Sequence, residues 1–141
     1  MRIMAIDYGD AHTGIAISDP TGFLAGFTTT INAYRPEVVA EQIARLAAEH
    51  GAEELVLGHP KNMDGTLGPR AEKAEAMAVM LREITGLPVV LWDERRTTID
   101  AHQILMNSGK NAKKRKKTVD AVAASLILEG YLTYKKSHPN G

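Results

Sequence analysis

The pattern of hydrophobic and polar residues differs between the beginning of the chain and the rest of it. Near the start, residues 2–7, 13–19 and 23–30 form short apolar stretches that are separated by turn residues. The gaps between these stretches are short, which favours hairpins and antiparallel pairing. The first stretch is almost continuously apolar, as expected of a buried strand. We therefore expect the chain to begin with three antiparallel strands.

From residue 36 onward, apolar residues recur at helical spacing. Two amphipathic helices are predicted at 36–51 and 69–86, because each has a proline in its first turn and ends at a glycine. Short apolar runs at 54–58 and 88–92 follow them and predict buried strands. A loop over residues 59–68 is expected between the first of these strands and the second helix. This part of the chain therefore alternates helix with strand.

Two further helices are predicted toward the end of the chain. One begins near Thr97, where Asp100 three residues later completes an approximate capping box, and ends at Gly109. The last is expected from about residue 118 to residue 134, after a basic loop, and is the longest and most apolar of the four. Together with the preceding elements, these helices predict a mixed α/β domain.

The continuous apolar runs also predict the topology of the sheet. The runs at 2–7, 54–58 and 88–92 are typical of parallel strands that are covered on both faces. Right-handed crossovers place the two later strands beside the first, which gives the strand order 3-2-1-4-5 with helices on both faces. This is the arrangement of the ribonuclease H-like fold. We expect one such domain over residues 1–136 and a frayed tail at 137–141.

The composition narrows the classes of function. The chain has 141 residues and no cysteine, which excludes a disulfide scaffold, a zinc–cysteine site and a cysteine nucleophile. Its apolar and charged fractions, 44% and 24%, are those of an ordinary globular protein. No apolar run approaches the roughly 20 residues of a membrane span, and the N-terminus lacks a signal peptide's apolar stretch. We expect a cytoplasmic protein with no membrane association.

The net charge of zero conceals a strong asymmetry. Residues 1–109 carry a net charge of −6, whereas residues 110–141 carry +6. Most of the positive charge belongs to one basic run, which consists of Lys110, Lys113, Lys114, Arg115, Lys116 and Lys117. Such a run repels itself and attracts polyanions, so it indicates a nucleic-acid partner, with a solvated loop as the alternative.

Three acidic positions do not belong to exposed helix faces. Asp7 closes the most apolar strand, and Asp93-Glu94 follows the last strand. Asp120 lies near a predicted helix start, on one stripe with apolar residues such as Ala124. If the strands are parallel, Asp7 and Glu94 leave the sheet at its carboxyl edge, where open α/β sheets bind ligands. The alternatives are a turn cap at Asp7, a favourable helix start at Asp120, and a surface pair at Asp93-Glu94.

Together these carboxylates predict a metal site. Asp7, Glu94 and Asp120 would form an all-oxygen cluster, with Asp93 or Asp64 as additional members. Clustered carboxylates repel one another and need a cation, and an all-oxygen set suits Mg²⁺ or Mn²⁺. Two such ions about 3.5–4 Å apart can activate a water and stabilise the leaving oxygen in phosphodiester hydrolysis.

Five motifs follow one another in the order found in a known family. They are Ala5–Gly9, Gly14–Asp19, Gly58–Gly65, Asp93–Thr98, and Lys114–Lys116 running into Val119–Ala124. Any one of them is weak, but the five in order resemble the YqgF family, also called RuvX, of bacterial ribonuclease H-like nucleases. The resemblance extends from Met1 to about Leu132.

The resemblance implies a nuclease that acts on the 5′ end of precursor 16S ribosomal RNA. It implies catalytic, metal-binding acids at Asp7, Glu94 and Asp120. The family has also been connected with Holliday-junction resolution, through its similarity to a DNA-cutting relative of the same fold. The chain departs from the family pattern at His12 and His59, and we expect His59 to pack rather than to contact substrate.

Further residues are candidates for contact with nucleic acid. Arg95 and Arg96 would hold a phosphate, or one of them would pair with Asp93 instead. Asn62 would line the same edge or form a turn, and the basic run would follow the nucleic-acid backbone. We keep three alternatives to the RNA nuclease: a branched-DNA resolvase, a non-catalytic rRNA-binding assembly factor, and an actin- or kinase-like ATPase. The last is disfavoured because 141 residues hold one copy of a domain that those proteins duplicate. The oligomeric state is left open between a monomer and a weak dimer.

Overall fold

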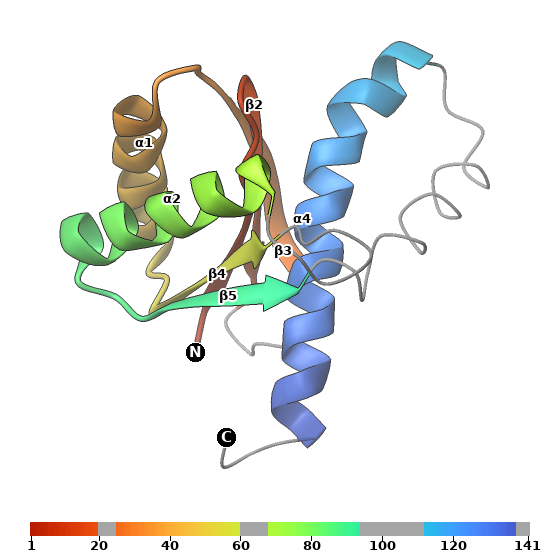
Figure 1. Ribbon diagram of the computed structural model, residues 1–141. Helices are drawn as coiled ribbons and strands as arrows, with labels where there is room; N and C mark the ends of the chain where they lie inside the picture. Colours follow the sequence, from red (N-terminus) through yellow and green to blue (C-terminus); the bar gives the residue numbers. More distant parts are fainter. Residues whose placement is uncertain (20–24, 60–67, 94–111, 138–141) are drawn as a thin grey trace.

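The fold is a five-stranded mixed sheet with helices on both faces (Figure 1). The computed structural model describes residues 1–19, 25–59, 68–93 and 112–137. The strands are β1 (Ile3–Asp7), β2 (His12–Ser18), β3 (Ala25–Asn32), β4 (Glu54–His59) and β5 (Val89–Asp93). The helices in the described ranges are α1 (Pro36–His50), α2 (Pro69–Thr85) and α4 (Ala112–Ser137).

The strand order is β3-β2-β1-β4-β5, as the apolar pattern predicted. β1 pairs antiparallel with β2 and parallel with β4, while β5 extends the parallel part beyond β4. The predicted strand limits differ from the observed ones by one or two residues. His59, for example, belongs to β4 rather than to the following loop, because the parallel ladder continues to its partner Asp93.

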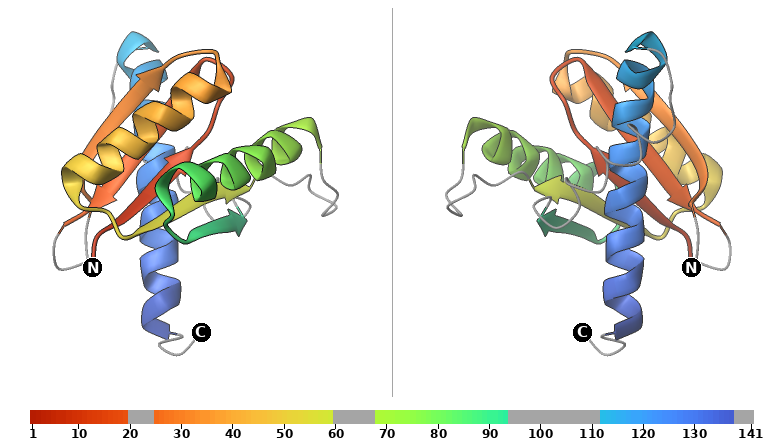
Figure 2. Two further views of the ribbon diagram at one scale, coloured as in Figure 1. Left: turned by 90° about the vertical axis from the view of Figure 1, so that its left-hand side faces the viewer. Right: turned by 90° about the vertical axis from the view of Figure 1, so that its right-hand side faces the viewer.

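α1 and α2 cover one face of the sheet and α4 covers the other (Figure 2), and an apolar cluster lies on each face. On one face, α1 and α2 pack side chains such as Ile43 and Leu81 onto Ile6 and the rest of that surface. On the other face, α4 packs Ile127 and Leu128 onto the sheet. Alternate residues of β1, β2, β4 and β5 therefore enter opposite clusters, as the pleat requires.

The ends of α1 and α2 follow from single residues. Each helix has proline in its first turn, where the missing backbone N–H is not needed for a helical hydrogen bond. Each is followed by a glycine in the left-handed region, Gly51 with φ 68° and Gly86 with φ 69°. A side chain is unfavourable in that conformation, so glycine stops the helix there.

The last helix begins earlier in the chain than the sequence predicted. α4 begins at Ala112 and runs to Ser137, so residues 112–117 of the basic run are helical rather than part of a loop. Alanine, lysine and arginine are favourable helix formers, and no glycine or proline interrupts residues 112–129. The prediction gave too much weight to the mutual repulsion of the charges. The predicted helix from Thr97 to Gly109 lies outside the described residues, as does the tail beyond Ser137.

None of the helices in the described ranges combines the length and the apolar character that a membrane crossing requires.

Candidate functional site

Asp7 ends the central strand at the carboxyl edge of the parallel part of the sheet. Along β1, Ile3 and Ala5 enter the cluster under α4, whereas Met4 and Ile6 face α1 and α2. Asp7 lies two residues after Ala5, so its side chain faces the same side of the sheet as those of Ile3 and Ala5, and it is half-buried. The structure therefore places this carboxylate at the α4 side of the sheet edge.

The tight turn after Asp7 depends on Gly9. A Cβ atom built on this residue would lie 2.3 Å from the backbone oxygen of His12, a distance that no real side chain tolerates. The Gly9 N–H also donates to the hydroxyl of Thr13 at 3.4 Å. The glycine thus allows β2 to return directly beside β1 and fixes the chain immediately after Asp7.

His59 and Asp93 lie side by side at the same edge but on the other face. His59 is buried, and its Nε2 lies 3.0 Å from Oε1 of Glu75 on α2. Asp93 is the register partner of His59 in β5, and partners in a sheet share a face. His59 therefore packs against α2, as expected. Asp93, a candidate additional metal ligand, lies on the opposite face from Asp7.

Asp120 lies within α4 and not at its start. The helix begins at Ala112, so Asp120 lies eight residues inside it. A helix dipole favours an acidic residue only within the first turn. The alternative that Asp120 improves a helix start is therefore wrong. Four residues further along, Ala124 is buried in the cluster between α4 and the sheet.

The remaining predicted site residues are only partly covered by the structure. Outside the described ranges lie Glu94, Arg95, Arg96, Asn62, Asp64 and Lys110. The first turns of α4 contain Lys113, Lys114, Arg115, Lys116 and Lys117. Among the side chains that the structure describes, no three carboxylates or histidines gather as a metal-binding group.

An ion pair that the sequence analysis missed joins the hairpin turn to α2. Lys73 Nζ lies 2.8 Å from Oδ1 of Asp10, which follows Gly9 in the turn between β1 and β2. The hydrogen bond from Lys73 lowers the pKa of Asp10, and the same bond raises the pKa of Lys73. The two residues are 63 positions apart, so no local pattern could have paired them.

A second missed group is a buried carboxylate at the amino edge of the sheet. Glu54 begins β4 and accepts hydrogen bonds from two residues of α4, from Tyr131 Oη at 2.5 Å and from Lys135 Nζ at 2.9 Å. Burial, followed by the bond to Glu54, raises the pKa of Tyr131, so this phenol stays protonated and donates. The contacts attach α4 to β4 far from Asp7.

The strand order β3-β2-β1-β4-β5 with helices on both faces defines the class of fold to which the protein belongs, the ribonuclease H-like fold. One similar structure is that of RuvC from T. thermophilus in complex with a Holliday-junction substrate. It superposes on this chain with a TM-score of 0.65 at 14% sequence identity, and the match covers 98% of this chain and 97% of RuvC.

The family is shown by the sequence itself. Residues 1–134 match the family described as "RuvX: Holliday junction resolvase". A protein of Halothermothrix orenii named "Putative pre-16S rRNA nuclease" is 46% identical over 135 residues, 96% of each chain. A relative of the same name from Geobacillus thermodenitrificans is 44% identical over 96% of this chain and 100% of its own. The chain belongs to the RuvX family.

Proposed function

We propose that this protein is a metal-dependent nuclease that hydrolyses phosphodiester bonds in RNA and processes the 5′ end of precursor 16S rRNA. The observation that carries the proposal is the name shared by relatives that are 46% and 44% identical over almost the whole chain. A cytoplasmic location follows from the proposed substrate.

The proposed site is formed by Asp7, Glu94 and Asp120. Asp7 lies at the α4 side of the sheet edge, and Asp120 belongs to the helix that covers that side. Glu94 directly follows β5, which ends at the same edge. The three side chains offer only carboxylate oxygens, the donor set that Mg²⁺ and Mn²⁺ prefer. When bound, such an ion would lower the pKa of a water and neutralise charge on the phosphodiester.

The other predicted residues of the chain would position the RNA. The basic run, whose residues 113–117 form the first turns of α4, would hold phosphates of the backbone leading to the acids. Arg95 and Arg96 follow Glu94 and would hold a phosphate close to it. Asn62, in the segment after β4, would contact the same strand of RNA.

The test is cleavage by the purified protein in Mg²⁺ or Mn²⁺. A labelled 5′ segment of precursor 16S rRNA is compared with a four-way DNA junction, using wild type and the Asp7→Asn variant. We expect the wild type to cut the RNA. The variant should fold normally but lose cleavage, because the amide keeps the shape of the carboxylate and removes its charge.

Glu53→Gln is the control, because it also converts a carboxylate to an amide, but Glu53 is exposed and lies before β4, at the opposite edge. It should cut at the wild-type rate. Cleavage by Asp7→Asn at that rate would end the catalytic assignment. Cutting of the junction alone would instead favour a resolvase, and RNA binding without any cutting would favour an assembly factor.

A further inference from the structure

The turn between β1 and β2 follows Asp7 at the sheet edge and has two other elements beside it. The backbone N–H of Ala33, directly after β3, donates to the carbonyl of Ala11 in the turn at 3.1 Å. Lys73 of α2 forms its ion pair with Asp10 in the same turn. The segment after β3 and the first turns of α2 therefore both lie next to this turn. Asp7 faces the α4 side, so an RNA strand that came along α4 and crossed the sheet edge would reach the turn.

Arg70 is an exposed arginine near this turn, and it forms no ion pair with any residue that the structure describes. It precedes Lys73 by three residues on α2. The hydrogen bond and the charge of Lys73 lower the pKa of Asp10, and the charge of Arg70 adds to this effect. Because Lys73 and Asp10 neutralise each other, Arg70 leaves the group with one net positive charge. Glu72 does not offset it, since side chains two positions apart do not face each other on a helix.

Tyr34 is the most exposed large hydrophobic residue in the described part of the chain, at 81%. An apolar residue just before the N-cap of a helix often packs on the fourth residue of that helix. In α1 this residue is Val39, which is buried in the cluster between the helix and the sheet, and the exposed Tyr34 forms no such contact. The neighbouring Arg35 pairs with Glu37 at 3.8 Å, so the two charges next to Tyr34 offset each other. The Tyr34 ring is therefore available to a ligand.

We propose that Tyr34 and Arg70, which we call the turn surface, bind single-stranded RNA where it leaves Asp7, with a base stacked on Tyr34 and a phosphate on Arg70. A strand of RNA alternates flat bases with charged phosphates. A tyrosine ring can stack on any base, and a guanidinium can donate two parallel hydrogen bonds to a phosphate. The turn surface would therefore hold the strand in place without reading its sequence.

The turn surface extends the proposed nuclease function and rests on it. The basic run belongs to α4, which covers one face of the sheet, whereas Arg70 belongs to α2 on the other face. The basic run can therefore hold the RNA on only one side of Asp7. A second contact beyond the turn would fix the strand on both sides of the bond to be cut.

The test is the binding of a labelled single-stranded 5′ segment of precursor 16S rRNA in EDTA, measured by fluorescence anisotropy across a salt series. Arg70→Ala should weaken binding and reduce the slope of log K against log salt by about 0.7, because one phosphate contact is lost. Tyr34→Ala should weaken binding about 5- to 150-fold and keep the slope, because stacking involves no charge. Tyr34→Phe should bind like the wild type, because it keeps the ring.

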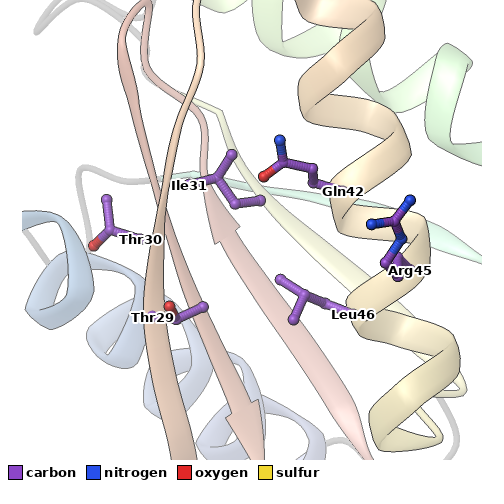
Figure 3. A pocket seen from close by; sticks show the side chains of 6 residues that line it. All are labelled: Thr29, Thr30, Ile31, Gln42, Arg45 and Leu46. Carbon is purple, nitrogen blue, oxygen red and sulfur yellow. The ribbon is translucent and has the colours of Figure 1, made fainter.

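Arg45→Ala is the matched control for Arg70→Ala. Arg45 is also an exposed arginine on a helix of the same face, without an ion pair among the described residues, but it lines a hollow of about 280 Å³ between β3 and α1 (Figure 3). The exposed Glu41 and Glu49 flank it one helical turn away on either side, so a phosphate would be repelled there. This variant should keep the wild-type affinity and slope.

Cleavage in Mg²⁺ or Mn²⁺ separates this inference from the proposed function. Arg70→Ala and Tyr34→Ala should raise KM and leave kcat nearly unchanged, because neither residue would touch the reacting atoms. If the wild type cuts the RNA but either alanine variant binds it as tightly as the wild type, the turn surface is overturned and the nuclease stands. If the wild type binds RNA without cutting it and both variants bind more weakly, the turn surface stands and the nuclease is overturned. A wild type that does not bind the RNA would overturn both.

Discussion

Glu54 shows how a single residue can determine the position of a whole helix. Its carboxylate is buried at the start of β4, where an isolated charge would be strongly unfavourable. Tyr131 and Lys135 from α4 both donate to it, and the Lys135 ammonium also lies 5.5 Å from the centre of the Tyr131 ring. Removing either donor leaves the carboxylate under-satisfied, so these side chains fix how α4 lies against the sheet.

The Tyr131→Phe variant measures this contribution. It keeps the ring that meets Trp92 edge-on at 5.9 Å but removes the hydroxyl that donates to Glu54. We expect the free energy of unfolding to fall by about 1.5–3 kcal/mol, the range for hydrogen bonds to charged groups, measured by urea denaturation. Tyr34→Phe is the control, because Tyr34 is 81% exposed, and it should leave stability unchanged. An equal loss in both variants would contradict the assignment.

The β1–β2 hairpin is the element that holds Asp7 at the sheet edge. Its turn is closed by Gly9 through a close approach to His12, and the ion pair from Asp10 to Lys73 attaches it to α2. The ion pair is exposed, so it contributes less to stability than the backbone geometry does. The hairpin is therefore most sensitive at Gly9.

Substitution of Gly9 by alanine should affect both stability and the proposed activity. The added Cβ would clash with the His12 backbone, and relieving the clash must move the turn next to Asp7. Overpacking of this kind costs about 1–3 kcal/mol, which thermal or urea unfolding would measure. RNA cleavage should also fall when it is measured well below the unfolding transition. If the variant is as stable and as active as the wild type, the turn can adjust without moving Asp7.

At the scale of the whole molecule, α4 connects the two halves of the charge distribution. Its first turns contain the basic residues 113–117, Asp120 follows them, and its later turns pack on a sheet that belongs to the acidic part of the chain. We expect this helical run to bind the phosphate backbone of RNA, as proposed above.

The dependence of RNA binding on salt tests this arrangement. Affinity for single-stranded RNA should fall steeply with salt, and each lost phosphate contact should reduce the slope of log K against log salt by about 0.7. Replacing Lys114, Arg115 and Lys116 together by alanine should flatten the slope accordingly, as measured by anisotropy across a salt series. Arg35→Ala, remote from α4 in the sequence, should keep the wild-type slope. A wild-type affinity that does not change with salt would contradict the role of the basic run.

The hydrophobic pattern by itself determined the five strands, their order and the four pairings, two antiparallel and two parallel, that define the fold. Periodicity, proline and glycine positions, and the handedness of crossovers are local or generic, so a single sequence contains them. The same pattern placed Asp7 at the sheet edge, while the complete set of Asp7, Glu94 and Asp120 stays a prediction. The sequence also located α4 but not its start, because helix propensity outweighed charge repulsion in the basic run.

Only the tertiary structure decided which distant side chains meet. Asp10 and Lys73 are 63 positions apart, and Glu54 is 77 and 81 positions from its two partners on α4. Such contacts follow from the packing of whole elements, in which each side chain's partner is set by layers, register and helix orientation rather than by its neighbours in the chain. The sequence therefore determines the layout of the sheet, and the packed structure determines its ion pairs and the partners of its buried carboxylate.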